Sequence, residues 1–331
     1  MIMINTPLRT EKLNFKNRLA YPPIFVGKAS PDGKITQDTL DYYDEKTKDG
    51  AFSMVTIEHS FIMQEGKASS GQVSVADDST IEGLSKLAQT IHANGTNAVL
   101  QLNHAGSCSE ESITGMPLAG PSHVENPRKG GTPREMSIED IKAVEEAFLA
   151  AAIRGKEAGF DGVEIHGAHS YLLNQFYSPL SNFRKDQYGG SLENRIRIHL
   201  EIIQKVRQEL GNNYPIFLRL GACDHREGGS QIEDGVAAAK AFVEAGVDVL
   251  DISGGMCGYV NPESTKPGYF GEEAKAIKEA VDVPVILTGG VKTPEDIETL
   301  LQAGAADIIG VGRTAMADST WAKKAIEFYQ E

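Results

Sequence analysis

Cysteine is scarce in this sequence, and long apolar runs are absent. The three cysteines, Cys108, Cys223 and Cys257, stand far apart and form no CxxC pair. Their spacing therefore signals neither a disulfide framework nor a metal site of the zinc or iron–sulfur type. No segment approaches the roughly 18 apolar residues that a membrane span needs, and residues 1–19 are too polar for a signal peptide. These absences favour a reduced, cytoplasmic setting.

Basic residues are also few. Lys and Arg number 32 against 46 Asp and Glu, which gives a formal net charge of −14 over 331 residues. Nucleic acids and anionic lipid surfaces are bound mainly through Lys and Arg. We therefore expect neither a nucleic-acid partner nor a membrane partner.

Short apolar runs alternate with longer segments of helical period. Each run is apolar throughout, as is typical of parallel strands that are covered on both faces. The runs predicted as strands are residues 19–25, 52–57, 97–102, 162–166, 216–220, 247–252, 283–287 and 307–311.

Several of the intervening segments carry helix-start signals. Ser137, Ser191 and Thr293 each precede a segment of helical period, and Pro294 occupies the favoured first helical position. Glycines stand where helices should end, because glycine adopts the left-handed turn that other residues resist. These glycines are Gly159, Gly211, Gly246 and Gly304.

Eight strand–helix pairs predict a parallel sheet, which is either a closed barrel or an open doubly wound sheet. No GxGxxG loop follows an early strand, and this favours the barrel. We therefore predict an α/β fold of the (β/α)8 TIM-barrel class, with residues 1–331 as one domain. The stretch 106–134 is rich in Gly, Pro and Ser, and we predict that it forms an extended loop after strand three on the catalytic face.

The motif His166-Gly-Ala-His169-Ser-Tyr171 follows the fourth predicted strand, at the rim where active sites of this fold lie. Two imidazoles can hold a carbonyl oxygen, and a phenol can supply a proton to carbon. We assign His166, His169 and Tyr171 as candidate catalytic residues. The alternatives are a structural histidine pair and a metal pair that lacks its carboxylate.

Glycine and arginine follow the last two predicted strands. Gly289-Gly290 and Gly312-Arg313 allow backbone N–H groups and a guanidinium to approach a phosphate, which many barrels bind at this place. Arg219 lies inside the apolar strand IFLRLG and needs an anionic partner, either a reduced flavin or a carboxylate such as Glu164 or Asp251.

Two further positions end predicted strands. The Gln101 amide suits the pyrimidine edge of a flavin, although a polar rim residue satisfied by protein neighbours is an equal alternative. Pro22-Pro23 suits a strand terminus, because proline donates no ladder hydrogen bond. The charged loop 184–195 is better explained as a structural clamp than as part of the site.

Together these segments resemble the old yellow enzyme family of NADH or NADPH:flavin oxidoreductases. The matching phrases span about residues 5–315 in family order. They are NRLAYPPI, VLQLNHAG, EIHGAHSYLLNQFYSPLSNFRKDQYGGSLENRIR, IFLRLG, ILTGGV and GVGR.

The resemblance implies FMN as cofactor, NADH or NADPH as reductant, and hydride transfer through the flavin to the activated C=C of a small α,β-unsaturated carbonyl compound. It implies that His166 and His169 grip the substrate carbonyl and that Tyr171 protonates the α-carbon. The residues that it places around the FMN are Pro23, His59, Gln101, Arg219, Gly290, Gly312 and Arg313.

The sequence departs from one subgroup of the family at Phe25, where a redox-tuning cysteine stands, and at Gly27, where a tyrosine stands. His59 occupies a position that is often small. The sequence also lacks the cysteine-rich linker and the further dinucleotide domains of the longer members of the family. Substrate scope, the choice between NADH and NADPH, and assembly into a homo-oligomer stay open.

Three other functions are compatible with the residues. An FMN-dependent dehydrogenase or demethylase would run the chemistry in reverse, but Tyr171 favours reduction because oxidation needs no proton donor to carbon. A flavin-binding partner subunit with little catalysis would not need the complete His–His–Tyr set. A metal-dependent barrel lyase would use His166 and His169 and would contain no flavin.

Overall fold

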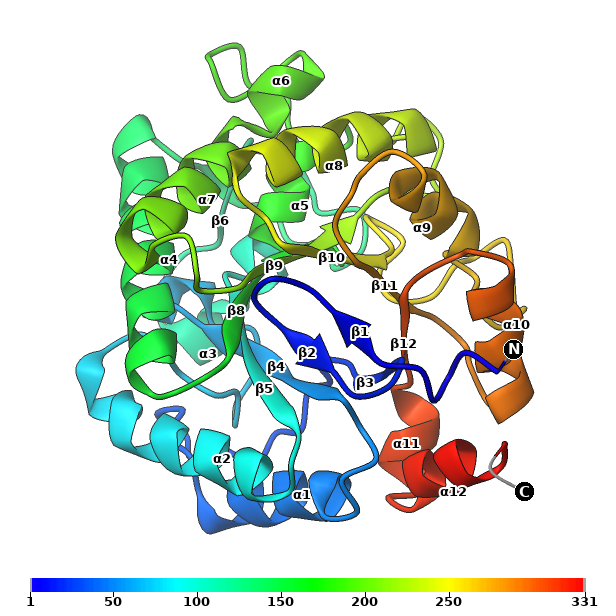
Figure 1. Cartoon of the computed structure of the whole chain (residues 1–331). Helices are drawn as coiled ribbons and strands as arrows, with labels where there is room; N and C mark the ends of the chain where they lie inside the picture. Colours follow the sequence, from blue (N-terminus) through cyan, green and yellow to red (C-terminus); the bar gives the residue numbers. More distant parts are fainter. Residues whose placement is uncertain (1, 330–331) are drawn as a thin grey trace.

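The centre of the molecule is a closed barrel of eight parallel strands (Figure 1). The structure is a computed structural model that describes residues 2–329. The predicted TIM barrel is thereby confirmed, and the open sheet is wrong. In order around the barrel the strands are β3 (Leu19–Tyr21), β4 (Met54–Phe61), β5 (Asn97–Asn103), β8 (Gly162–Gly167), β9 (Ile216–Gly221), β10 (Val249–Ser253), β11 (Val285–Thr288) and β12 (Ile308–Gly310), which pairs back with β3.

Every predicted strand corresponds to a barrel strand, but several ends differ. β3 stops at Tyr21 and does not continue to residue 25, because Pro22 and Pro23 cannot donate to the ladder. β4 runs on to Phe61, beyond the predicted end at residue 57. Its pairing with β5 shifts register between Ile57 and Ser60, and apolar periodicity does not reveal such an irregularity.

Helices cover the outside of the barrel (Figure 1). One principal helix follows each barrel strand. In chain order from β3 to β12 these helices are α1 (Gln37–Thr47), α2 (Ile81–Ala93), α4 (Ile138–Glu157), α7 (Arg197–Leu210), α8 (Ile232–Ala245), α9 (Gly271–Lys278), α10 (Pro294–Gln302) and α12 (Trp321–Glu327). Shorter helical segments are η1 (Gln64–Gly66), η2 (Asp78–Thr80), η3 (Gly106–Cys108), α3 (Glu111–Thr114), α5 (Leu172–Tyr177), α6 (Leu192–Arg195) and α11 (Arg313–Ala317). Within residues 2–329, none of the helices combines the length and apolar character of a membrane span.

Two of the predicted helix starts are closed by side-chain caps. Ser137 and Asp140 form a capping box at α4, and Thr293 forms one with Asp296 at α10. The third start differs, because Ser191 makes no cap hydrogen bond and its helix is divided into α6 and α7 at Ile196. The four glycines predicted to end helices all have positive φ.

A short N-terminal ribbon closes one end of the barrel. Strands β1 (Leu8–Arg9) and β2 (Asn14–Phe15) pair antiparallel and lie across the barrel in Figure 1. Leu13 and Phe15 pack against apolar side chains inside the barrel, including Val99 and Phe217. This end is therefore filled, and the opposite rim, where the strands end, is left for a site.

Long connections shape that opposite rim. The stretch 106–134 contains η3 and α3 and pairs β6 (Ala119–Gly120) with β7 (Arg134–Glu135). The charged loop 184–195 acts as a clamp, as predicted. Arg184 donates to the carbonyls of Pro121 and Met136, so this loop anchors the stretch that follows β5.

Candidate active site

A cavity of about 800 Å³ opens at the C-terminal rim of the barrel. Its walls come from residues in or just after each of the eight barrel strands, so the cavity depends on barrel closure. All ten site residues predicted from the sequence line it. They are Pro23, His59, Gln101, His166, His169, Tyr171, Arg219, Gly290, Gly312 and Arg313.

His166, His169 and Tyr171 meet at one wall of the cavity. The His166 ring centroid lies 5.1 Å from that of His169 and 5.1 Å from that of Tyr171. This proximity depends on a tight turn between β8 and α5, in which His169 and Ser170 have φ of 61° and 66°. Such left-handed conformations cost non-glycine residues on the order of 1–3 kcal/mol, and they gather at functional sites.

A hydrogen bond sets the tautomer of His166, and burial sets the charge of both imidazoles. The main-chain N–H of Ala168 donates to Nδ1 of His166 at 3.3 Å, so Nε2 of His166 carries the hydrogen. His169 pairs through Nε2 with the Ser253 hydroxyl at 2.7 Å. Burial is the main cause that holds the pKa of each imidazole well below the usual 6.5. At neutral pH both rings are uncharged, and each has one N–H to donate.

Tyr171 lies between two imidazoles. Its ring stacks on His59 with centroids 5.6 Å apart and planes at 22°, and His166 meets it edge-on. Burial raises the pKa of the Tyr171 phenol, so the hydroxyl keeps its proton across the neutral range. The phenol is therefore available as a proton donor and not as a base.

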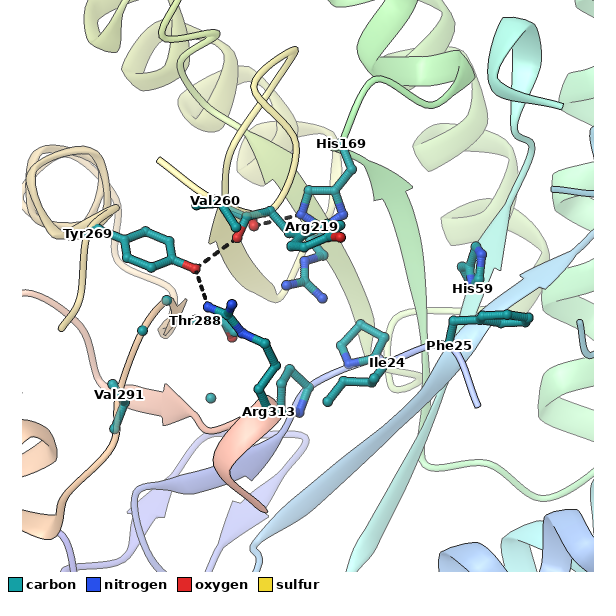
Figure 2. Close-up of a pocket in the computed structure, with 18 of the residues that line it drawn as sticks. Ile24, Phe25, His59, His169, Arg219, Val260, Tyr269, Thr288, Val291 and Arg313 are labelled. Carbon is teal, nitrogen blue, oxygen red and sulfur yellow. Dashed lines mark hydrogen bonds between the residues drawn. The ribbon is translucent and has the colours of Figure 1, made fainter. Parts of the chain in front are cut away.

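Arg219 occupies the floor of the cavity. The strand register places it between His166 on β8 and Asp251 on β10, and its Nε lies 3.5 Å from an Asp251 carboxylate oxygen. That Nε is buried without a hydrogen-bond partner, and the guanidinium points into the cavity in Figure 2. The carboxylate pairing considered from the sequence exists, and Arg219 still presents charge to a ligand.

Buried carboxyl groups surround this arginine. Burial raises the pKa of Glu164 and of Asp251. Nε2 of Gln101 donates to Glu164 at 2.7 Å, so the carbonyl oxygen of this cavity-lining amide is the group left for a ligand. It can accept from an imide N–H, such as that on the pyrimidine edge of a flavin.

The loops after β11 and β12 form a cradle without side chains. A Cβ atom at Gly289 or Gly290 would come within 2.9 or 2.8 Å of the Tyr269 ring, and one at Gly312 would meet Ile24 at 3.2 Å. Arg313 stands beside the cradle and donates to the Tyr269 hydroxyl at 3.3 Å (Figure 2). Backbone N–H groups with an adjacent guanidinium suit a phosphate.

One wall of the cavity was not predicted from the sequence. The loop 254–270, which follows β10, contributes Tyr259, Val260 and Tyr269, and the Tyr269 hydroxyl donates to the carbonyl of Tyr259 at 2.8 Å. This stretch is rich in Gly and Pro. The same composition predicted a functional loop after β5, and it marks the loop 254–270 equally.

The described residues fit a flavin mononucleotide. The glycine cradle with Arg313 suits its phosphate, Gln101 offers an acceptor for the ring edge, and Arg219 has an unpartnered buried Nε beside the cavity. The barrel and this rim define the chain as a (β/α)8-barrel enzyme.

The chain belongs to the NADH:flavin oxidoreductase / NADH oxidase family, whose model matches residues 4–330. The name of this family specifies a flavin and NADH, and the residues that line the cavity fit the flavin.

Two curated relatives match nearly the whole chain. An NADH oxidase of Thermoanaerobacter brockii is 38% identical over 324 residues, which is 96% of this chain and 50% of that protein. A metal reductase of Desulforamulus reducens is 34% identical over 334 residues, which is 100% of this chain and 50% of that protein. The chain therefore spans about half the length of the curated relatives it matches.

Solved structures show the same architecture. A 2-naphthoyl-CoA reductase in complex with 2-naphthoyl-CoA is 28% identical, with a TM-score of 0.91 over 98% of this chain and 52% of that one. A morphinone reductase variant in complex with tetrahydroNAD is 25% identical, with a TM-score of 0.84 over 97% of this chain and 90% of that one. An old yellow enzyme homologue from Zymomonas mobilis, 24% identical with a TM-score of 0.86 over 98% and 93%, supports the fold alone.

Proposed function

We propose that this chain reduces the C=C bond of small α,β-unsaturated carbonyl compounds, and that residues 1–331 form one FMN-binding barrel domain. One observation carries the proposal. Two neutral imidazoles and a protonated phenol share one wall of the cavity that holds the phosphate cradle. This set can bind a carbonyl oxygen and protonate carbon in the same step.

The chain's own residues divide into two groups in this proposal. Gly290, Gly312 and Arg313 hold the phosphate of FMN, and Gln101 and Arg219 bind its ring system. Pro23 and His59, on the β3 and β4 side of the cavity, complete the ring site. When bound, FMN supplies the redox centre that accepts hydride from NADH or NADPH and delivers it to the substrate.

His166 and His169 orient the substrate. Their N–H groups bind the carbonyl oxygen and stabilise the negative charge that develops on it as the C=C bond is reduced. Because both pKa values are held low by burial, the rings bind the oxygen as neutral donors and no proton is lost to it. The Tyr171 hydroxyl then gives its proton to the α-carbon.

The carbonyl group belongs to an enone or to a thioester. The 28% identical relative whose structure contains 2-naphthoyl-CoA supports the thioester as a second acceptor class. Both classes offer the same oxygen to His166 and His169, so the site residues do not divide them. An assay of each substrate type in turn distinguishes the two classes.

The test is an anaerobic product analysis of the flavin-loaded protein. With NADH or NADPH in excess, cyclohexenone and an unsaturated acyl-CoA are supplied separately, and the saturated products are quantified. We expect one saturated product per nucleotide oxidised with at least one of the two acceptors. Nucleotide oxidation that requires oxygen and yields no saturated product would refute the proposal.

A further inference from the structure

Three potential metal ligands meet outside the cavity wall. Cys223 and His225 follow β9, and Glu273 lies in the first turn of α9. One ligand atom from each residue lies within 4.8 Å of the others. Cys223 is 7% exposed and Glu273 is 2% exposed, so the group is enclosed by protein. None of the three lines the cavity, and the proposed reaction uses none of them.

We propose that Cys223, His225 and Glu273 bind a divalent transition-metal ion of the zinc class. A thiolate, an imidazole and a carboxylate together suit zinc, whereas magnesium and calcium prefer oxygen ligands alone. Zinc lies about 2.3 Å from sulfur and about 2.0–2.1 Å from nitrogen or oxygen. The observed spacing allows all three bonds after small side-chain rotations.

The surroundings of His225 support this assignment. Its Nε2 lies 2.5 Å from Glu273, and its Nδ1 lies 3.3 Å from the carboxylate of Glu263. Metal-binding histidines regularly donate their second N–H to a carboxylate, which fixes the tautomer and the ring orientation. Glu263 therefore has the position of an orienting residue, while Nε2 contacts Glu273.

The two carboxylate contacts of His225 also have a simpler explanation that needs no metal ion. A protonated His225 between Glu263 and Glu273 would account for both contacts without any ion. That ion pair gives the Cys223 thiol no part, although the thiol stands in the same group. Cys223 is therefore the residue whose replacement divides the two explanations.

A bound metal ion would crosslink segments that form the wall of the active-site cavity. It would join the segment after β9 to α9 and, through Glu263, to the loop 254–270. That loop carries Tyr259 and Tyr269, which wall the cavity. No local sequence pattern marks the site, because Glu273 lies 48 positions from His225 and the cysteines form no pair.

The test uses tag-free holoenzyme that is stripped with a chelator and then titrated with Zn²⁺ and, separately, with Co²⁺. We expect one ion per chain by elemental analysis, together with cobalt absorption bands at longer wavelength than the flavin bands. Cys223→Ser should weaken Zn²⁺ affinity by more than about 100-fold, because it removes a direct ligand. Cys108→Ser, a buried thiol outside the group, should retain the ion.

A second variant tests the site even if Cys223→Ser fails to fold. Glu263 is 73% exposed, so Glu263→Gln should fold normally and weaken Zn²⁺ affinity about 10-fold, as loss of an orienting carboxylate does. Two results would overturn the proposal. The wild-type protein could retain no zinc at micromolar concentrations, or Cys223→Ser could bind zinc as tightly as the wild type.

Discussion

Arg128 donates from Nη1 to the main-chain carbonyl of His169 at 2.7 Å. Arg128 belongs to the long stretch after β5, and its guanidinium also lies over the Tyr259 ring, 5.4 Å from the centroid. His169 is one of the two residues in the strained turn after β8. Arg128 therefore connects two rim loops to the turn that positions an imidazole of the site.

Loss of this contact should loosen the His169 turn. A hydrogen bond from a charged donor contributes about 1.5–3 kcal/mol, so we expect Arg128→Met to weaken binding of a phenol or enone ligand by roughly 10-fold. The FMN content should not change, because Arg128 does not line the flavin cavity. Ligand titration of the flavin spectrum measures the effect. The exposed neighbour Lys129, changed to Met, is the matched control, and equal affinities in the two variants would contradict this role.

The sequence predicted the barrel because its signals are local. Each strand is a short apolar run, and the caps at Ser137 and Thr293 lie within four residues of their partners. The place of the predicted site residues at the cavity was also predictable. His166, Gly290 and Arg313 stand at or just after strand ends, and closure of the barrel brings all strand ends to one rim.

Contacts that join distant segments were not predictable in this way. The Arg128–His169 bond spans 41 positions, and no local pattern marks Arg128. The Tyr269 wall depends on how the loop 254–270 folds back over the rim. The register shift in β4 between Ile57 and Ser60 depends on its neighbour β5. In each case tertiary packing decides the outcome, and a single sequence carries no periodic trace of it.

Arg219 should matter for stability as well as for the flavin. Removal of one partner from a buried ion pair leaves the other charge uncompensated, at a cost of about 3–5 kcal/mol. We expect Arg219→Met to lower the free energy of unfolding by about 3 kcal/mol and to slow reduction of the bound flavin by NADH, since a cation beside the ring favours reduction. Urea unfolding and anaerobic rapid mixing measure the two effects.

The matched control for Arg219 is the double variant Arg219→Met with Asp251→Asn. It removes the carboxylate that the single variant leaves buried. The double variant should regain part of the lost stability but none of the lost reduction rate. Equal unfolding free energies for the single and double variants would show that Arg219 and Asp251 are not coupled.

His199 should make the protein sensitive to acid. It is buried on α7, it stacks on Phe242, and neither ring nitrogen has a hydrogen-bond partner. Burial lowers its pKa to about 3, whereas an unfolded histidine has a pKa of about 6.5. Between these values the unfolded state binds a proton that the folded state does not. The contribution of His199 to stability is therefore lost as pH falls below about 6.5.

His199→Phe keeps an aromatic ring on Phe242 and removes the titration. We expect the unfolding free energy of the variant, relative to the wild type, to rise by about 1 kcal/mol when pH is lowered from 6 to 5. Urea unfolding at the two pH values measures this difference between proteins, so other titrating groups cancel. A difference that does not change with pH would show that His199 binds its proton as readily in the folded protein as in the unfolded chain.

If Tyr171 gives a proton to substrate carbon, as we propose, Tyr171→Phe should affect only one of the two half-reactions. Anaerobic rapid mixing with NADH, and then with cyclohexenone, measures each half separately. We predict an unchanged rate of reduction by NADH and a rate of reoxidation by the enone that is lower by about 10²- to 10⁴-fold, the usual contribution of a general acid. Equal slowing of both halves, or no slowing of the second, would mean that Tyr171 is not the proton donor.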